Sequence, residues 1–147
     1  MRFRILEKPL LESEIHRFMQ LVEDWKYCQW GEDNFLCDLP AKWELSFAAY
    51  ERDELAGFCF ASNKEGVYYI HLFYLAPGCR GKSLGKQMIQ NAVAIANSYR
   101  LGVIELRCPA SNVIGLEFYK KNGFAVERVL HDHVGGGEPD YYLQLKC

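Results

Sequence analysis

Small and cationic residues are concentrated in one stretch, 76–86 (APGCRGKSLGK), which directly follows an apolar run. Arg80, Lys82 and Lys86 supply positive charge, and the glycines among them allow a ligand to approach the backbone. If a helix begins after Ser83, its first amide groups have no partner within the helix and its dipole adds partial positive charge. These features predict a phosphate-binding turn between a strand and a helix.

The same stretch also resembles a nucleotide-binding P-loop, G-x-x-x-x-G-K-S/T. Residues 76–83 match that pattern everywhere except at the first position, where Ala76 replaces glycine. Pro77 removes an amide donor from the turn. The chain before this turn is rich in hairpins, whereas P-loop domains alternate strands and helices. The sequence therefore disfavours a nucleotide-binding P-loop in this stretch.

A second stretch, 112–124 (NVIGLEFYKKNGF), has the signals of a short helix. Asn112 is a suitable N-cap, and Asn122 with Gly123 forms a suitable C-terminal stop. Together the two stretches resemble the GNAT family of N-acetyltransferases. From Arg80 the first is similar to that family's pyrophosphate loop, Q/R-x-x-G-x-G/A, and the second to its helix N-x-x-A/G-x-x-F/L-Y-x-x-x-G-F. The resemblance extends over residues 2–147.

This resemblance implies one GNAT acetyltransferase domain, residues 1–147, that binds acetyl-CoA. The pyrophosphate would lie on the amides of the turn, and the pantetheine arm beside the end of the preceding strand. The residues implied in cofactor binding are Phe73, Leu75, Ala76, Arg80, Gly81, Lys82, Ser83, Leu84, Gly85, Lys86, Asn112 and Tyr119. Ser83 departs from the family, which usually has glycine there. Serine costs little in a helical backbone, but it strains the site if a positive φ is required.

The resemblance further implies an acyl-CoA-dependent N-acetyltransferase that acts directly on a primary amine of a small molecule or peptide. The amide of Leu75 would bind the charge that develops on the thioester oxygen. Tyr119, a phenol with an ordinary pKa of about 10, would protonate the leaving thiolate. The strand has no carboxylate, so we expect His71 to be the base, on one face with Phe73 and Leu75. Glu105 is the second candidate.

Each of these assignments has a structural alternative. Tyr119 is also compatible with a half-buried aromatic on an amphipathic helix, and His71 with a hydrogen-bonded core histidine. The absence of a strand carboxylate and the presence of Ser83 motivate a different class of function. This alternative is a non-catalytic acyl-CoA-binding sensor or interaction module on the same fold.

The acceptor site is predicted from side chains near both ends of the chain. Trp25, Trp30 and His131 are the candidate substrate-binding residues. Aromatic rings with acids nearby can hold a cationic amine. The acids in question are Glu23, Asp24, Glu32 and Asp33. The same aromatics are equally compatible with a core beneath a long loop.

Hydrophobic periodicity predicts the elements that must position these residues. Strands are expected at residues 2–7, 43–50, 54–62, 67–76, 103–108, 124–132 and 139–147, and helices at 10–27, 83–99 and 112–121. The apolar stripe of the second helix extends to Tyr99. This order predicts an α+β fold, with a mixed, mostly antiparallel sheet of about seven strands and helices on both faces. The last strand either completes the sheet or pairs across a homodimer.

Composition limits the remaining function classes. The 147 residues suit one domain, and a net charge of −2 argues against a nucleic-acid partner. No apolar run is long enough for a membrane span, and the N-terminal residues lack a signal peptide. We therefore expect a cytoplasmic protein whose six cysteines are free thiols. Their spacing predicts no metal site.

Overall fold

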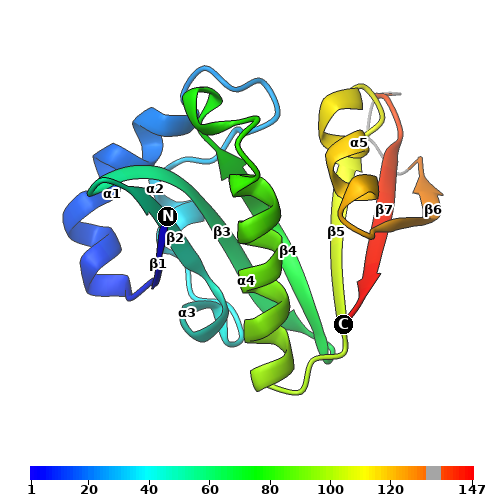
Figure 1. Cartoon of the computed structure of the whole chain (residues 1–147), viewed down its shortest axis with the longest axis horizontal. Helices are drawn as coiled ribbons and strands as arrows, with labels where there is room; N and C mark the ends of the chain where they lie inside the picture. The colour runs from blue at the N-terminus through cyan, green and yellow to red at the C-terminus, as the bar shows by residue number, and fades with distance from the viewer. Residues whose placement is uncertain (132–136) are drawn as a thin grey trace.

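Seven strands form one sheet in the order β1-β2-β3-β4-β5-β7-β6 in the computed structural model, which describes residues 1–131 and 137–147 (Figure 1). Only β4 and β5 are parallel; the other neighbouring strands are antiparallel. The strands are β1 (Arg2–Ile5), β2 (Phe47–Glu51), β3 (Glu54–Lys64), β4 (Val67–Leu75), β5 (Val103–Pro109), β6 (Ala125–Leu130) and β7 (Asp140–Lys146). The predicted α+β class and mixed sheet are confirmed. This hairpin-rich order also contradicts the P-loop interpretation.

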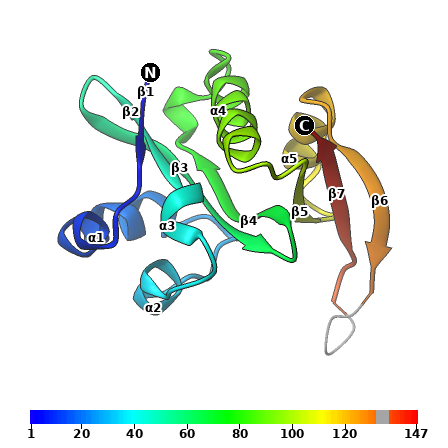
Figure 2. The same ribbon diagram turned by 90° about the horizontal axis from the view of Figure 1, so that it is seen from below.

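The helices cover both faces of the sheet (Figure 2). The described helices are α1 (Lys8–Val22), α2 (Glu32–Leu36), α3 (Lys42–Leu45), α4 (Leu84–Ser98) and α5 (Val113–Lys121), with a 3-10 turn at Pro77–Cys79. On one face, Phe18 of α1 and Phe35 of α2 pack against Phe58 and Phe60 of β3. A second buried cluster joins α4 to the opposite face of the sheet. Both helical layers therefore hold the sheet from which the site is built.

The segment between α1 and β2 differs most from prediction. The first helix ends at Val22, and the strand expected at residues 43–50 begins only at Phe47 because α3 precedes it. The ammonium of Lys42 donates to the carbonyls of Phe35 and Cys37 at 2.7 and 2.6 Å, which ties α3 to the end of α2. The hydroxyl of Ser46 then donates to the carbonyl of Ala61 on β3 and accepts from its amide. These side-chain contacts stabilise the helical turn where the pattern favours a strand.

The apolar stripe of α4 also differs at its end. Tyr99 lies just beyond the helix and is 52% exposed, whereas Ile89 is buried. The buried side follows Leu84, Met88, Ala92 and Ala96, each four residues after the last. A row with this spacing rotates around the helix, so it leaves Tyr99 outside the core.

One irregularity in β4 decides which side chains face the site. Phe60 pairs with Leu72, but the next residue of β3 pairs with Ile70, so His71 is an extra residue in β4. Such a β-bulge interrupts the alternation of side chains. Ile70 and Phe73 consequently lie in the same buried cluster, although they are three residues apart. After Ile70, β4 has no pairing with β5.

Candidate active site

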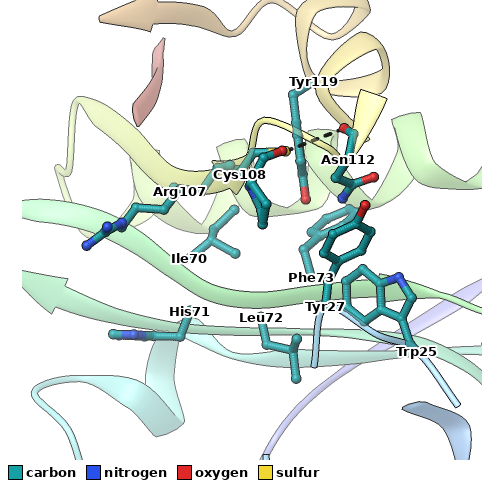
Figure 3. Close-up of a pocket in the computed structure, with 12 residues that line it drawn as sticks. Trp25, Tyr27, Ile70, His71, Leu72, Phe73, Arg107, Cys108, Asn112 and Tyr119 are labelled. Carbon is teal, nitrogen blue, oxygen red and sulfur yellow. Dashed lines mark hydrogen bonds between the residues drawn. The ribbon is translucent and has the colours of Figure 1, made fainter. Parts of the chain in front are cut away.

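A cavity of about 80 Å³ lies where β4 and β5 separate (Figure 3). Residues from four parts of the chain line it: the segment after α1, β4, β5, and α5 with its cap. They are Trp25, Tyr27, Ile70, His71, Leu72, Phe73, Leu106, Arg107, Cys108, Pro109, Asn112 and Tyr119. Five of the sequence-predicted site residues are therefore brought together here: Trp25, His71, Phe73, Asn112 and Tyr119.

Tyr119 enters this cavity from α5. Asn112 caps the helix, because its Oδ1 accepts from the amide of Gly115 at 3.0 Å. Figure 3 shows the Tyr119 ring pointing into the space between Cys108 and Asn112. Burial raises the pKa of the Tyr119 phenol, and the neighbouring Cys108 thiol acts in the same direction. The phenol therefore stays protonated at neutral pH and can donate a hydrogen bond to a developing negative charge.

The predicted phosphate turn has open space beside two of its glycines. Neither Gly78 nor Gly81 has any heavy atom within 4 Å of the position that a Cβ would occupy. Gly81 and Ser83 both adopt a positive φ, of 81° and 62°. The strained alternative for Ser83 is thus the one observed, since a left-handed backbone disfavours side chains other than glycine.

Arg80 contributes to the turn differently from the two lysines. Its Nε donates to the carbonyl of Leu75 at 2.8 Å, and its guanidinium lies 5.4 Å from the ring centroid of Tyr74. Lys82 and Lys86 are exposed. Arg80 is also exposed, but its contacts stabilise the end of β4.

Leu75, Ala76, Leu84 and Gly85 occupy the end of β4, the following turn and the first turn of α4. Leu75, Leu84 and Gly85 are buried. A Cβ on Gly85 would lie 2.6 Å from Cε1 of Phe118, so this glycine also permits the close contact of α4 with α5. The phosphate turn and the helix that carries Tyr119 are thereby packed directly together.

His71 corrects one prediction. The bulge places Ile70, instead of His71, in the cluster that contains Phe73 and Leu75. Nε2 of His71 is hydrogen-bonded to Oγ of Ser62 at 2.6 Å. In Figure 3 its ring points away from Tyr119.

The electrostatic surroundings keep His71 neutral. Burial lowers the pKa of His71 to about 4, and the positive charges of Lys42 and Lys64 contribute to this shift. At neutral pH the imidazole is therefore unprotonated, and it is a weak base. The structural and catalytic interpretations of His71 are compatible, since the residue is hydrogen-bonded and also lines the cavity.

Glu105 does not line the cavity. Its carboxylate accepts hydrogen bonds from the hydroxyl of Tyr142 and, at 2.6 Å, from Nε2 of Gln144. These donors engage both carboxylate oxygens and hold the group on the sheet.

The predicted acceptor residues are separated in the structure. Trp25 lines the cavity, but Trp30 packs against Phe35 and Phe60 at ring-centroid distances of 5.0 and 5.5 Å. His131 is exposed and lies beyond β6, beside a segment outside the described residues. The acids near the aromatics are also exposed, and none lines the cavity: Glu23, Asp24, Glu32 and Asp33. The aromatic and acidic side chains therefore do not form a common binding site for a cationic amine at the cavity.

Sequence reasoning missed Arg107 and Cys108 as cavity residues; Tyr27, one of the aromatic side chains near Trp25, lines the cavity as well. The hydroxyl of Tyr27 is 3.1 Å from Oγ of Ser111, and Ser111 in turn donates to Glu138 at 2.6 Å. These contacts connect three segments that are remote in the sequence. No local pattern could have indicated them.

The chain belongs to the acetyltransferase (GNAT) family, whose model matches residues 14–124, more than half of the chain. A relative, an uncharacterized N-acetyltransferase of Methanocaldococcus jannaschii, is 28% identical over 109 residues. That match covers 71% of this chain and 46% of the relative, so the chain spans just under half of that protein's length. The family membership confirms the resemblance inferred from the two stretches.

Solved structures support the same fold over almost the whole chain. The ribosomal-protein-S18-alanine N-acetyltransferase of Escherichia coli has a TM-score of 0.82 at 15% identity, covering 99% of this chain and 92% of that one. Arabidopsis thaliana Naa50, in complex with the bisubstrate analogue CoA-Ac-MVNAL, has a TM-score of 0.79 at 18% identity, covering 99% and 98%. At sequence identities this low, the structural similarity establishes the fold alone.

Two further observations concern metals and membranes. Within residues 1–131 and 137–147, no three His, Cys, Asp or Glu side chains are grouped so as to hold a metal ion. In the same part of the chain, no helix combines the length and apolar character needed to cross a membrane.

Proposed function

We propose that the protein transfers the acetyl group of acetyl-CoA directly to a primary amine of a small molecule or peptide, within a ternary complex. The amine nitrogen attacks the thioester carbonyl carbon, the carbon–sulfur bond breaks, and coenzyme A leaves as a thiol after it gains a proton. The observation that carries this proposal is the opening between β4 and β5, because Tyr119 lines it from a helix whose Phe118 packs against Gly85 at the start of α4.

The donor end of the site has the chemistry that a pyrophosphate requires. The amides at the start of α4 are unpaired within the helix, and Lys82 and Lys86 add charge beside them. The space around Gly78 and Gly81 allows phosphate oxygens to approach the backbone. The exposed edge of β4, ending at Leu75, would then accompany the pantetheine arm, with the Leu75 amide near the thioester oxygen.

The proton transfers are assigned to two residues. Tyr119 donates a hydrogen bond to the departing sulfur and stabilises it without ionising, because its pKa is raised. The thiolate then takes up, through water, the proton that the amine releases. His71, neutral at physiological pH, accepts the amine proton through water, since its ring points away from Tyr119. Neither step needs a covalent intermediate.

Cys108 supports direct transfer over a double displacement. Burial raises the pKa of its thiol to about 11, with Asp140 and Glu138 contributing. The nucleophilic form of cysteine is the thiolate. At neutral pH this thiol is almost entirely protonated, so it is a poor acceptor for the acetyl group.

The relatives support an amine acceptor that includes peptides. One acts on the alanine of a ribosomal protein, and another is bound to a CoA–peptide bisubstrate analogue. Both cover nearly the entire chain, including the acceptor side. We therefore keep peptides and small amines together as the substrate class.

Ligand-dependent unfolding followed by thiol release tests this proposal. Acetyl-CoA at about 100 times its Kd should stabilise the protein by about 2.7 kcal/mol, whereas ATP with magnesium should not. A mixture of amines and peptides should then release coenzyme A thiol. Stabilisation without release would favour the acyl-CoA sensor, and stabilisation by ATP alone would contradict both.

A further inference from the structure

We propose that Ser111 and Glu138 are positioning residues for the acceptor amine. They hold the hydroxyl of Tyr27 and thereby fix the segment after α1 as one wall of the cavity. Tyr27 lines the cavity, whereas Ser111 and Glu138 lie behind it and act through the tyrosine. This inference rests on the proposed acetyl transfer and adds the contacts that determine how its acceptor is held.

Three hydrogen bonds join Tyr27 to Glu138 through Ser111. The hydroxyl of Tyr27 lies 3.1 Å from Oγ of Ser111. Oγ of Ser111 donates to Oε1 of Glu138 at 2.6 Å, and the Ser111 amide donates to Oε2 at 3.1 Å. We call these three residues the Tyr27 bridge. The bridge connects the segment after α1, the turn before α5 and the residues that lead into β7.

The direction of the hydrogen bonds in the Tyr27 bridge follows from their chemistry. A serine hydroxyl has one proton to donate, and a carboxylate only accepts. Because Ser111 uses its hydroxyl proton on Glu138, it must accept from Tyr27, so the phenol is the donor. The carboxylate of Glu138 therefore fixes the orientation of the Tyr27 hydroxyl through Ser111.

The β7 end of the Tyr27 bridge is held against the end of β5 by further contacts. The amide of Ala110 donates to the carbonyl of Pro139 at 3.0 Å. Arg107 is paired with Asp140, with Nη2 and Oδ2 separated by 3.0 Å. Ser111 is thus attached to two segments that are already joined, and Tyr27 is attached to both of them through it.

The Tyr27 bridge lies on the side of the site from which the acceptor must enter. Trp25 packs with the buried cluster of α1, whereas α4, which follows the phosphate turn, packs with the cluster on the opposite face of the sheet. Trp25 and Tyr27 line the cavity together, with their ring centroids 5.9 Å apart (Figure 3). A cofactor on the phosphate turn reaches the cavity from the α4 face, so the amine must approach the thioester carbon from the α1 face.

The sheet itself does not hold the two sides of the cavity together. Pairing between β4 and β5 ends at Ile70 and Leu106. The Tyr27 bridge spans the opening beyond this point, since Tyr27 follows α1 and Ser111 follows β5. Loss of the bridge should therefore let the Tyr27 wall move and weaken acceptor binding. Acetyl-CoA binding should be unchanged, because the phosphate turn lies on the other face.

Acceptor kinetics test the Tyr27 bridge in Tyr27→Phe, Ser111→Ala and Glu138→Gln. The probes are a degenerate pool of short peptides with free α-amines and a panel of small primary amines, with thiol release from acetyl-CoA as the readout. Each variant should lower kcat/KM for the reacting acceptor about 3- to 10-fold, the range for the net loss of one hydrogen bond, mainly through KM. Combining Tyr27→Phe with Glu138→Gln should add little to the larger single loss, because both act through Ser111.

Two conservative variants separate the Tyr27 bridge from a general loss of stability. Ser111→Thr keeps the hydroxyl and should restore the acceptor KM that Ser111→Ala loses. Glu127→Gln removes the same charge as Glu138→Gln at an exposed position of β6 and should behave like the unmodified protein. A loss of stability with an unchanged acceptor KM would assign the bridge to folding alone and overturn the proposal.

Hydrogen exchange tests the Tyr27 bridge without any acceptor. The amide of Cys28 donates to the carbonyl of Trp25 at 3.1 Å, so its exchange reports on the segment that carries Tyr27. Mass spectrometry should show exchange about 3- to 10-fold faster there in Ser111→Ala, with α4 unchanged. Unchanged exchange at Cys28 would overturn the bridge. Absence of acetyl-CoA binding and of thiol release from every amine would instead contradict the acetyltransferase proposal, so the two failures are distinguishable.

Discussion

The two ends of the proposed site are built in different ways. The proposed donor end comes from one continuous stretch, residues 73–86, and presents mainly backbone groups and exposed cations. The acceptor end combines side chains that are far apart in sequence, such as Tyr27, His71 and Arg107. A backbone site tolerates many side chains if the chain conformation is kept, whereas a side-chain site depends on each residue. We therefore expect donor recognition to resist substitution better than acceptor recognition.

Tyr119→Phe is expected to have the largest effect, because Tyr119 lies between the two ends. Loss of the hydrogen-bond donor to sulfur should lower kcat by about 100-fold, the lower range for removing one donor to a developing negative charge. The Kd for acetyl-CoA should change by less than about twofold. Steady-state kinetics measures kcat, and titration calorimetry measures the Kd. Tyr99→Phe, at an exposed position, serves as the control. Equal losses of turnover and binding would assign Tyr119 to packing.

Substitutions at Ser83 test the backbone character of the donor end. Ser83→Val places a β-branched residue at a φ of 62°, which should cost about 1–2 kcal/mol and weaken acetyl-CoA binding by about 10-fold. Ser83→Gly relieves the same strain and should bind at least as tightly as the unmodified protein. If Ser83→Gly binds clearly more weakly, the serine hydroxyl itself contacts the ligand.

The smallest predicted effect concerns the pH dependence of stability. The folded state lowers the pKa of His71 from 6.5 to about 4, so folding favours the neutral imidazole. This contribution is complete above pH 6.5 and is lost as pH falls from there toward 4. Between pH 7 and 5 the loss should be about 1 kcal/mol after allowance for solvent screening.

Chemical denaturation at the two pH values measures this loss. It should be smaller in His71→Gln, whereas His16→Gln at an exposed site should behave like the unmodified protein. An identical loss in His71→Gln would mean that other groups produce the pH dependence.

The same contrast explains what the sequence could predict. The turn before α4 and the cap at Asn112 depend on local chemistry, namely glycines, helix amides and a capping side chain, and both elements were placed correctly. The phosphate-binding role of the turn stays a prediction. The orientation of His71 was wrong, because the bulge depends on how β4 pairs with β3. Trp25 and Trp30 are five residues apart and lie in different environments, which only the path of the intervening chain determines.

The extra residue in β4 makes one position of this strand differ from all the others. Tyr68 and Ile70 share a buried cluster with Phe73 and Leu75 because the bulge at His71 compensates for the odd spacing between the two pairs. Replacing His71 would change one side chain. Deleting it would remove the bulge and leave both pairs on the same face, whereas deleting another interior residue of β4 would shift the alternation. In an alignment of relatives, a gap of one residue inside β4 is therefore expected at His71.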